Sequence, residues 1–198
     1  MACCGLGPTF GAMQTMKVDR FDTILVTGLG PVGLGSVING VYRGARVLAV
    51  ESHPYRVKLA QELGAEKVFD PRDPDVLAQV REYTGGKGTD AGIDCSGVEA
   101  AQQLMIAAAR RKGRVAFVGE AGKLTLHVSN DLIRKGLTLH GQWHYNRADA
   151  PGIMEVIRGS REKLDRLITH RLSMSRVQEA FELQISGNCG KILLHPWD

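Results

Sequence analysis

The chain contains 198 residues, of which 43% are hydrophobic and 23% charged, and its formal net charge is +4. These values are typical of a soluble globular protein with one full α/β domain and additional elements. The small positive charge gives no support to nucleic-acid binding. No apolar stretch approaches a membrane-spanning length, and the N-terminal residues lack the basic start of a signal peptide. The four cysteines show neither metal-pair spacing nor a disulfide framework, so a cytoplasmic protein that binds no membrane is expected.

Strands and helices are expected to alternate from residue 22 to about residue 142. The expected strands are 23–27, 46–50, 67–70, 91–95, 114–118, 124–128 and 136–141, and the expected helices are 31–43, 54–63, 74–83 and 99–110, with a helical turn at 130–135. This alternation is typical of a doubly wound α/β fold, in which helices cover both faces of a mainly parallel sheet.

A polar break near 143–151 separates a domain at 22–145 from a C-terminal segment at 146–198. The C-terminal segment is predicted to be an α/β tail, with helices at 149–159 and 175–186 and strands at 167–169 and 190–194.

The densest basic run, Arg110–Arg114, is interpreted as the end of a helix. Cationic side chains favour the C-terminal end of the helix dipole, and Gly113 can serve as the cap. The run therefore does not indicate a nucleic-acid interface.

Three glycines follow the first expected strand at the spacing of a dinucleotide-binding turn. Gly28 allows the tight turn, and Gly30 lets the backbone approach a pyrophosphate. Gly33 lets the next helix pack close on the sheet. The start of that helix, which includes Pro31 and Val32, presents free N–H groups and a positive dipole end to the phosphates.

An acid, Glu51, ends the second expected strand, where it can accept hydrogen bonds from the adenosine ribose hydroxyls. Strand, glycines, helix, strand and acid in this order predict a Rossmann-type dinucleotide site. The carboxylate would repel a 2′-phosphate, which favours NAD, although Arg46, His53 and Arg56 nearby keep NADP open. A flavin dinucleotide is an alternative, and an S-adenosylmethionine site is disfavoured because Thr27 stands where such sites carry an acid.

Two further strand ends are expected to face the ligand. The fourth strand ends in Cys95, Ser96 and Gly97, at the sheet edge where such folds place ligands. Gly119 begins a second turn at the same edge. A buried cysteine at a strand end is more often a packing residue than a reactive one.

Nearly the whole chain resembles the cofactor-binding half of medium-chain, zinc-type alcohol dehydrogenases, including polyol and threonine dehydrogenases. The segments that carry the resemblance are 22–35, Glu51 with Arg56, 61–65, 94–97, 113–119, 179–182 and 190–194. The resemblance implies an NAD-linked oxidation of an alcohol to a carbonyl compound, or the reverse, with a catalytic zinc that polarises the alcohol oxygen.

The resemblance also implies roles for individual residues. Gly28, Gly30, Gly33 and Glu51 match the pyrophosphate turn and the ribose acid, and Arg56 matches a basic position near the adenosine end. Residues that match the stretches beside the nicotinamide are Val118, Gly119, Thr138 and His140. Lys191 falls where some members place a cation on the pyrophosphate. Surface lysines or arginines without a ligand are the alternative for the basic positions.

The zinc ligands of the family are missing from this chain. It has no Gly-His-Glu motif and no four-cysteine lobe. Cys4 matches a family ligand position, but one cysteine cannot build a three-ligand catalytic site. Residues 1–21 resemble the segment that links the two halves of the parent enzyme. We therefore expect no zinc here and a chain that binds NAD without turning over substrate; the alternative is a stand-alone dinucleotide-binding module or subunit.

The resemblance further implies a homodimer, because strand 124–128 matches the region where family dimers join their sheets. Without a catalytic domain, apolar residues of the C-terminal segment are expected to lack cover: Ile153, Ile157, Leu167, Phe181 and those of the last strand, 190–194.

Overall fold

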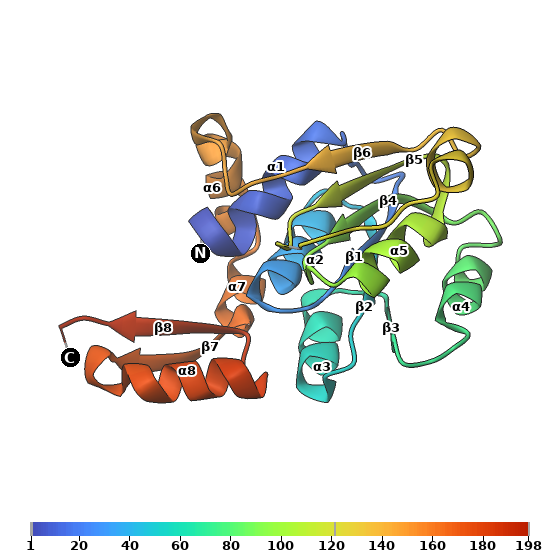
Figure 1. The fold of residues 1–198 in the computed structure, drawn as a ribbon. Helices are drawn as coiled ribbons and strands as arrows, with labels where there is room; N and C mark the ends of the chain where they lie inside the picture. The colour runs from blue at the N-terminus through green and yellow to red at the C-terminus, as the bar shows by residue number, and fades with distance from the viewer. Residues whose placement is uncertain (1, 121, 198) are drawn as a thin grey trace.

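The computed structural model describes residues 2–120 and 122–197 (Figure 1). Met1, Ala121 and Asp198, which belong to the predicted segments 1–21, 22–145 and 146–198, lie outside the described residues. The main sheet has six strands in the order β3-β2-β1-β4-β5-β6, and every neighbouring pair is parallel. Its strands are β1 (Thr23–Thr27), β2 (Arg46–Val50), β3 (Lys67–Phe69), β4 (Thr89–Asp94), β5 (Ala109–Phe117) and β6 (Thr138–Gly141).

The helices of the main domain begin and end at residues suited to those places. They are α1 (Gly7–Thr15), α2 (Pro31–Tyr42), α3 (Pro54–Leu63), α4 (Val76–Tyr83) and α5 (Glu99–Ala108), with a π-helical η1 (Ala2–Leu6) and η2 (Val128–Ile133). Proline opens α2 and α3 at their first position, where no N–H is needed. Gly64 ends α3 in the left-handed conformation, at φ 110°.

Alternate residues of the central strands enter different cores. On β1, Ile24 and Val26 belong to the larger cluster, which α1, α2 and α3 cover, whereas Leu25 belongs to the cluster under α4. Successive side chains of a strand point to opposite faces, so both faces of the sheet are buried. The predicted doubly wound fold is confirmed.

The strand register brings the carboxyl ends of the strands to one edge. Thr27 on β1 lies opposite Val50 of β2 and Asp94 of β4, and Asp94 lies opposite Phe117 of β5. The turns that follow these residues therefore stand side by side, which is where open α/β sheets bind ligands.

The N-terminal segment packs into the main core. Leu6 and Met13 are fully buried. The side-chain amide of Asn39, on α2, donates to the carbonyl oxygen of Leu6 at 2.9 Å and to Thr9 Oγ1 at 2.8 Å. These buried bonds tie η1 and α1 to the helix that follows the glycine turn.

The predicted strand at 124–128 is wrong. Residues 123–127 form no ladder, and Val128 begins η2. Thr125 instead exchanges bonds with α5: its N–H donates to the Glu99 carboxylate at 2.7 Å, and its carbonyl accepts from Gln103. Leu124 and Leu126 pack against the cluster that includes residues of α5 and β5. Their alternation therefore reflects side-chain packing and not strand pairing.

The predicted helix end at Arg110–Arg114 is also wrong, because α5 ends at Ala108 and β5 begins at Ala109. Arg110 forms an ion pair with Asp90, and Arg114 forms one with Asp22. The basic run therefore ties strands together, and Gly113 caps no helix.

The cation at the end of α5 comes from far along the chain. The ammonium of Lys135 donates to the carbonyl oxygens of Ile106, Ala107 and Ala109, at 2.8, 2.8 and 3.1 Å. Partial burial and the nearby Arg81 lower the pKa of Lys135 from its ordinary value.

The C-terminal segment contains α6 (Ala150–Gly159), α7 (Arg161–Leu167), β7 (Ile168–Ser173), α8 (Val177–Ser186) and β8 (Lys191–His195), with short 3-10 turns at η3 (Arg147–Asp149) and η4 (Met174–Arg176). Strands β7 and β8 pair in parallel as a second, two-stranded sheet. Figure 1 shows this unit with α8 beside α3 and apart from the main sheet.

The expected lack of cover is wrong for three of the four residues. Ile153 and Leu167 are buried, and Ile157 packs against the larger core cluster, because α6 and α7 fold back onto the main domain. Phe181 on α8 is exposed, at 61%, and the residues of the last strand, β8, are half-buried. None of the helices in the described part of the chain combines the length and apolar composition that a membrane crossing requires.

Candidate functional site

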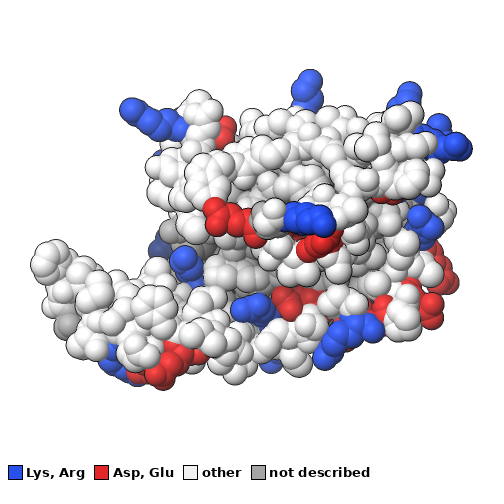
Figure 2. Space-filling view, in the orientation of Figure 1, with Lys and Arg blue, Asp and Glu red and all other residues white. Residues whose placement is uncertain are grey.

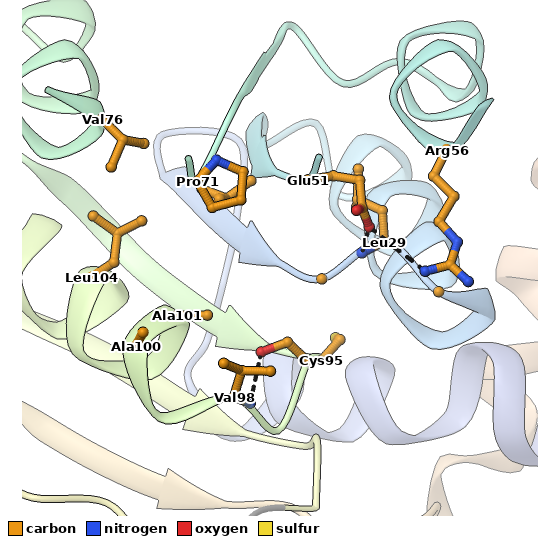
Figure 3. Close-up of a pocket in the computed structure, with 14 residues that line it drawn as sticks. Leu29, Glu51, Arg56, Pro71, Val76, Cys95, Val98, Ala100, Ala101 and Leu104 are labelled. Carbon is orange, nitrogen blue, oxygen red and sulfur yellow. Dashed lines mark hydrogen bonds and ion pairs between the residues drawn. The ribbon is translucent and has the colours of Figure 1, made fainter. Parts of the chain in front are cut away.

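A cavity of about 500 Å³ opens at the carboxyl edge of the main sheet (Figure 3). It is lined by Gly28, Leu29, Gly30, Val50, Glu51, Arg56, Pro71, Val76, Cys95, Ser96, Val98, Ala100, Ala101 and Leu104. The turn after β1 and the end of β2 form one side, and α5 forms the other. Figure 2 shows the same face hollowed, with basic and acidic side chains mixed across it rather than gathered in one basic patch.

The three glycines of the turn meet three different requirements. Gly28 has φ 80°, in the left-handed region, and a Cβ there would lie 2.7 Å from the Cβ of Ser96. A Cβ at Gly33 would overlap with the carbonyl oxygen of Gly28. A Cβ at Gly30 would meet nothing within 4 Å. At Gly30 the absence of a side chain leaves open space at the cavity.

The start of α2 offers hydrogen-bond donors to that space. Gly30 is the residue before the helix, and among the described residues no side chain caps this end. Pro31 has no N–H, so the donors without an intrahelical acceptor include those of Val32 and Gly33. Free N–H groups and the positive end of the helix dipole favour an anion here.

Glu51 joins the two turns that border this space. Its Oε2 accepts from the N–H of Leu29 at 2.9 Å, and its Oε1 accepts from the N–H of Ser52 and His53 at 2.8 and 3.0 Å. The guanidinium of Arg56 lies 4.0 Å from Oε2. The carboxylate side chain is only 10% exposed. Figure 3 shows Glu51 facing Leu29 and Arg56.

The turn after β4 forms another border of the cavity. Cys95 and Ser96 line it, and the hydroxyl oxygen of Ser96 accepts from the N–H of Val98 at 3.1 Å. Burial, together with the negative charge of Asp94, raises the pKa of the Cys95 thiol. Cys95 therefore stays protonated and unreactive at neutral pH, as expected for a packing cysteine.

The turn after β5 lies directly against the turn after β4. The N–H groups of Val118 and Gly119 both donate to the carbonyl oxygen of Asp94, at 2.9 Å each. A Cβ at Gly119 would overlap with the N–H of Gly97. This turn belongs to the same edge, but it does not line the cavity itself.

The remaining predicted residues lie outside the cavity. Thr138 and His140 are on β6, at the edge of the sheet beyond β5. Lys191 begins β8 and lines a separate shallow pocket with α8. Of the fourteen residues predicted to bind the cofactor, the structure therefore brings six to one cavity: Gly28, Gly30, Glu51, Arg56, Cys95 and Ser96. Pro31, Val32 and Gly33 adjoin them at the start of α2.

Cys4 is exposed in η1. Within residues 2–120 and 122–197, no three His, Cys, Asp or Glu side chains come together as a metal site would require. The described residues thus do not offer a zinc ion the set of three protein ligands that a catalytic site needs.

Sequence reasoning missed the apolar wall of the cavity and one buried acid. Val76, Val98, Ala101 and Leu104 give the cavity a largely apolar side, suited to a flat aromatic ring. Asp94 is fully buried at the end of β4. Its place, an acid as the last residue of an apolar strand, was the available signal.

Comparisons with known proteins point to one family. The family model described as zinc-binding dehydrogenase matches residues 31–159. L-threonine 3-dehydrogenase from Symbiobacterium thermophilum is 35% identical over 184 residues, which cover 88% of this chain and 51% of that protein.

Solved structures show the same fold. Alcohol dehydrogenase from Thermotoga maritima is 26% identical with a TM-score of 0.90, and it covers 98% of this chain, which spans 55% of that one. 2R,3R-butanediol dehydrogenase from Bacillus subtilis is 28% identical with a TM-score of 0.89, with coverage of 98% and 56%. The chain thus spans about half the length of these relatives.

Proposed function

Because this chain belongs to the zinc-binding dehydrogenase family, we propose that it is the NAD-binding part of a dehydrogenase that oxidises an alcohol or polyol to a carbonyl compound. The observation that carries the proposal is the cavity at the carboxyl edge of the sheet, where the glycine turn and Glu51 lie together. The names of the relatives support an alcohol as the substrate of the parent enzyme. When bound, NAD supplies the hydride acceptor.

The residues of the cavity fit the parts of a dinucleotide. The N–H groups at the start of α2 bind the pyrophosphate, and the open space at Gly30 admits it. Glu51 accepts hydrogen bonds from the ribose hydroxyls, and Arg56 holds the carboxylate in place. The apolar wall of Val98, Ala101 and Leu104 packs on the adenine.

The other half of the dinucleotide extends along the sheet edge toward β5 and β6. Val118 and Gly119 follow β5, and Thr138 and His140 lie on the neighbouring β6. We assign these four residues to the nicotinamide end. Lys191 stays a proposed cation for the pyrophosphate, although it lies on β8 and outside the cavity.

The proposed domains are those of the sequence: a linking segment at 1–21, the NAD-binding domain at 22–145 and a C-terminal segment at 146–198 that joins a catalytic domain in the parent enzyme. The exposed apolar side chains on α8 and beyond it, Phe181, Ile185 and Trp197, support a contact with further protein.

Replacing Glu51 by alanine tests the cofactor assignment. We expect Glu51→Ala to weaken NAD⁺ binding by about 1–3 kcal/mol, the scale for charge-assisted hydrogen bonds. Calorimetric titration of the full chain measures this, with thermal unfolding to show that the variant folds. Glu62→Ala is the matched control, because it removes an exposed carboxylate from α3. Unchanged affinity would remove Glu51 from the site, and tighter binding of NADP⁺ than NAD⁺ to the wild-type chain would overturn the choice of NAD.

We also propose a homodimer that joins through β6, one of the two edge strands of the main sheet, since 124–128 forms no strand. Light scattering at micromolar concentration is expected to give twice the chain mass of 21.5 kDa. A mass equal to one chain contradicts it.

A further inference from the structure

The buried carboxylate of Asp94 accepts hydrogen bonds from several turns at the edge of the sheet beside the cavity, and we call it the hub of this edge. It is 0% exposed. Its Oδ1 accepts from Thr27 Oγ1 at 2.9 Å, from the N–H of Ser96 at 3.0 Å and from Ser96 Oγ at 2.6 Å. Its Oδ2 accepts from the N–H of Gly97 at 3.2 Å and from Gln102 Nε2 at 2.8 Å. All five donors are uncharged groups.

These bonds connect three loops and a helix through one residue. Thr27 is the last residue of β1 and immediately precedes Gly28, so the carboxylate fixes the start of the glycine turn. Ser96 and Gly97 form the turn after β4, and Gln102 lies on α5. The backbone carbonyl of the same aspartate holds the turn after β5.

A buried carboxylate needs such a full set of donors. Burying an ionised group is unfavourable unless hydrogen bonds replace its water. A hydrophobic residue or an amide at this place would relieve that penalty, yet neither could accept from every one of the donors. The carboxylate, with two acceptor oxygens and no donor, therefore matches the donors that surround it.

We propose that Asp94 is a positioning residue for the nicotinamide half of the dinucleotide, an inference that rests on the proposed function. It acts through the turn at Ser96 and Gly97, which packs directly on Gly119. The adenosine half depends on Glu51 and Arg56, which are held by separate bonds, and on the apolar wall at α5, which the buried core residues Met105 and Ile106 anchor in addition to Gln102. A change that frees the turn at Ser96 and Gly97 but keeps the bond to Gln102 therefore affects the nicotinamide half more than the adenosine half.

The change Asp94→Asn is expected to remove one defined hydrogen bond, the one from the N–H of Gly97. Gln102 Oε1 is buried and has no partner among the described residues. If the new amide nitrogen takes the place of Oδ2, the Gln102 amide can turn over and accept from it. The N–H of Gly97 then loses its acceptor, because an amide N–H₂ only donates. The turn after β4 is loosened, while the cores on both faces keep their side chains.

Calorimetric titration of the full chain with NAD⁺ and, separately, with AMP tests this inference. We expect Asp94→Asn to weaken NAD⁺ binding about tenfold or more and AMP binding less than about threefold. Thr27→Val removes one donor to the same carboxylate and is expected to act in the same direction, whereas Thr27→Ser keeps the hydroxyl and restores wild-type binding. Thermal unfolding of each variant shows whether it folds.

Equal weakening of both ligands, or unchanged NAD⁺ affinity, overturns the positioning role. If Asp94→Asn does not fold, the Thr27→Val and Thr27→Ser pair decides by the same split between NAD⁺ and AMP. A wild-type chain that binds neither ligand overturns the proposed function itself, which separates that failure from the failure of this inference.

Discussion

Replacing two glycines of the same turn by alanine is expected to affect different properties, stability at Gly33 and NAD⁺ binding at Gly30. The Cβ of Gly33→Ala would overlap with the backbone carbonyl of Gly28, whereas the Cβ of Gly30→Ala would meet nothing within 4 Å. Gly30 has φ −64° and ψ −175°, which alanine adopts without strain. The first change therefore damages the fold, and the second fills space that the pyrophosphate needs.

The size of the first effect follows from what stands in the way. The obstacle for a methyl group at Gly33 is backbone, so no flexible side chain can turn aside. The start of α2 would have to move on the order of 1–2 Å to restore an ordinary contact distance. Overpacking of this kind costs about 3 kcal/mol. For a chain of this length that corresponds to a fall in Tm of roughly 6–12 °C.

The size of the second effect differs in kind. Gly30 precedes α2, where alanine is a poorer cap than glycine, but alanine also restricts the unfolded chain. These two contributions are each about 1 kcal/mol or less and opposite in sign, so Tm should shift by only a few degrees. Binding should fall, because the methyl group lies in the path of the phosphates.

Thermal unfolding by circular dichroism and calorimetric titration with NAD⁺ measure both quantities on each variant. The contrast between the two glycines is refuted if Gly33→Ala keeps the wild-type Tm, or if Gly30→Ala loses as much stability as Gly33→Ala. Wild-type NAD⁺ affinity in a folded Gly30→Ala variant would place the pyrophosphate elsewhere.

Two further predictions concern ion pairs and caps outside the cavity. Partial burial raises the pKa of Asp90, but the bonds from the N–H of Thr23 and the guanidinium of Arg110 outweigh it and lower the pKa overall. The contribution of the Asp90 carboxylate to stability is therefore present above about pH 4 and is lost as pH falls through the lowered pKa. In urea titrations, Asp90→Asn should reduce the free energy of unfolding by about 1 kcal/mol at pH 7 and by less near pH 3. A difference that does not change with pH would contradict this. Lys135→Met keeps the length of the side chain but removes the cation from the end of α5. Urea unfolding at pH 7 should therefore show a free energy of unfolding lower by about 1–2 kcal/mol. Unchanged stability would mean that the three carbonyl oxygens find other donors.

The parallel main sheet with helices on both faces could be predicted because local signals agreed. The glycine turn, Glu51 and short strands separated by helices each indicate a parallel sheet, and the structure has one. The glycine Gly64 marked the end of α3 correctly, since only a residue that tolerates positive φ fits there. A structural feature can be predicted from the sequence where only one residue type fits the backbone conformation.

The errors have a different physical origin. Leu124 and Leu126 alternate as a strand would, but they pack on α5 and β5 and leave their backbone unpaired with the sheet. Arg110 and Arg114 looked like helix-end cations, yet their partners, Asp90 and Asp22, lie 20 and 92 residues away in sequence. Periodicity and local charge do not encode such distant partners.

At the candidate site, too, features set by local spacing could be predicted, and features that depend on distant partners could not. The glycine turn and Glu51 could be predicted to lie together because their spacing along the chain places both at the same edge of the sheet, where the structure has a cavity. The network around Asp94 could not be predicted, because its donors Thr27 and Gln102 come to the carboxylate only on folding. The apolar wall from α5 was missed for the same reason, as its side chains resemble those of any buried helix face.

The burial of the N-terminal segment in the main core has a consequence for how this protein can be divided. Residues 2–16 include several side chains that the core cannot lose, Leu6, Phe10, Met13 and Met16 among them. A version of the chain that starts at residue 22 would leave a groove along α2, with the amide of Asn39 stripped of its acceptors. A synthetic peptide of residues 2–21 would carry the acceptors of Leu6 and Thr9 and the apolar side chains that fill this groove, so the two pieces could be mixed to reassemble the fold.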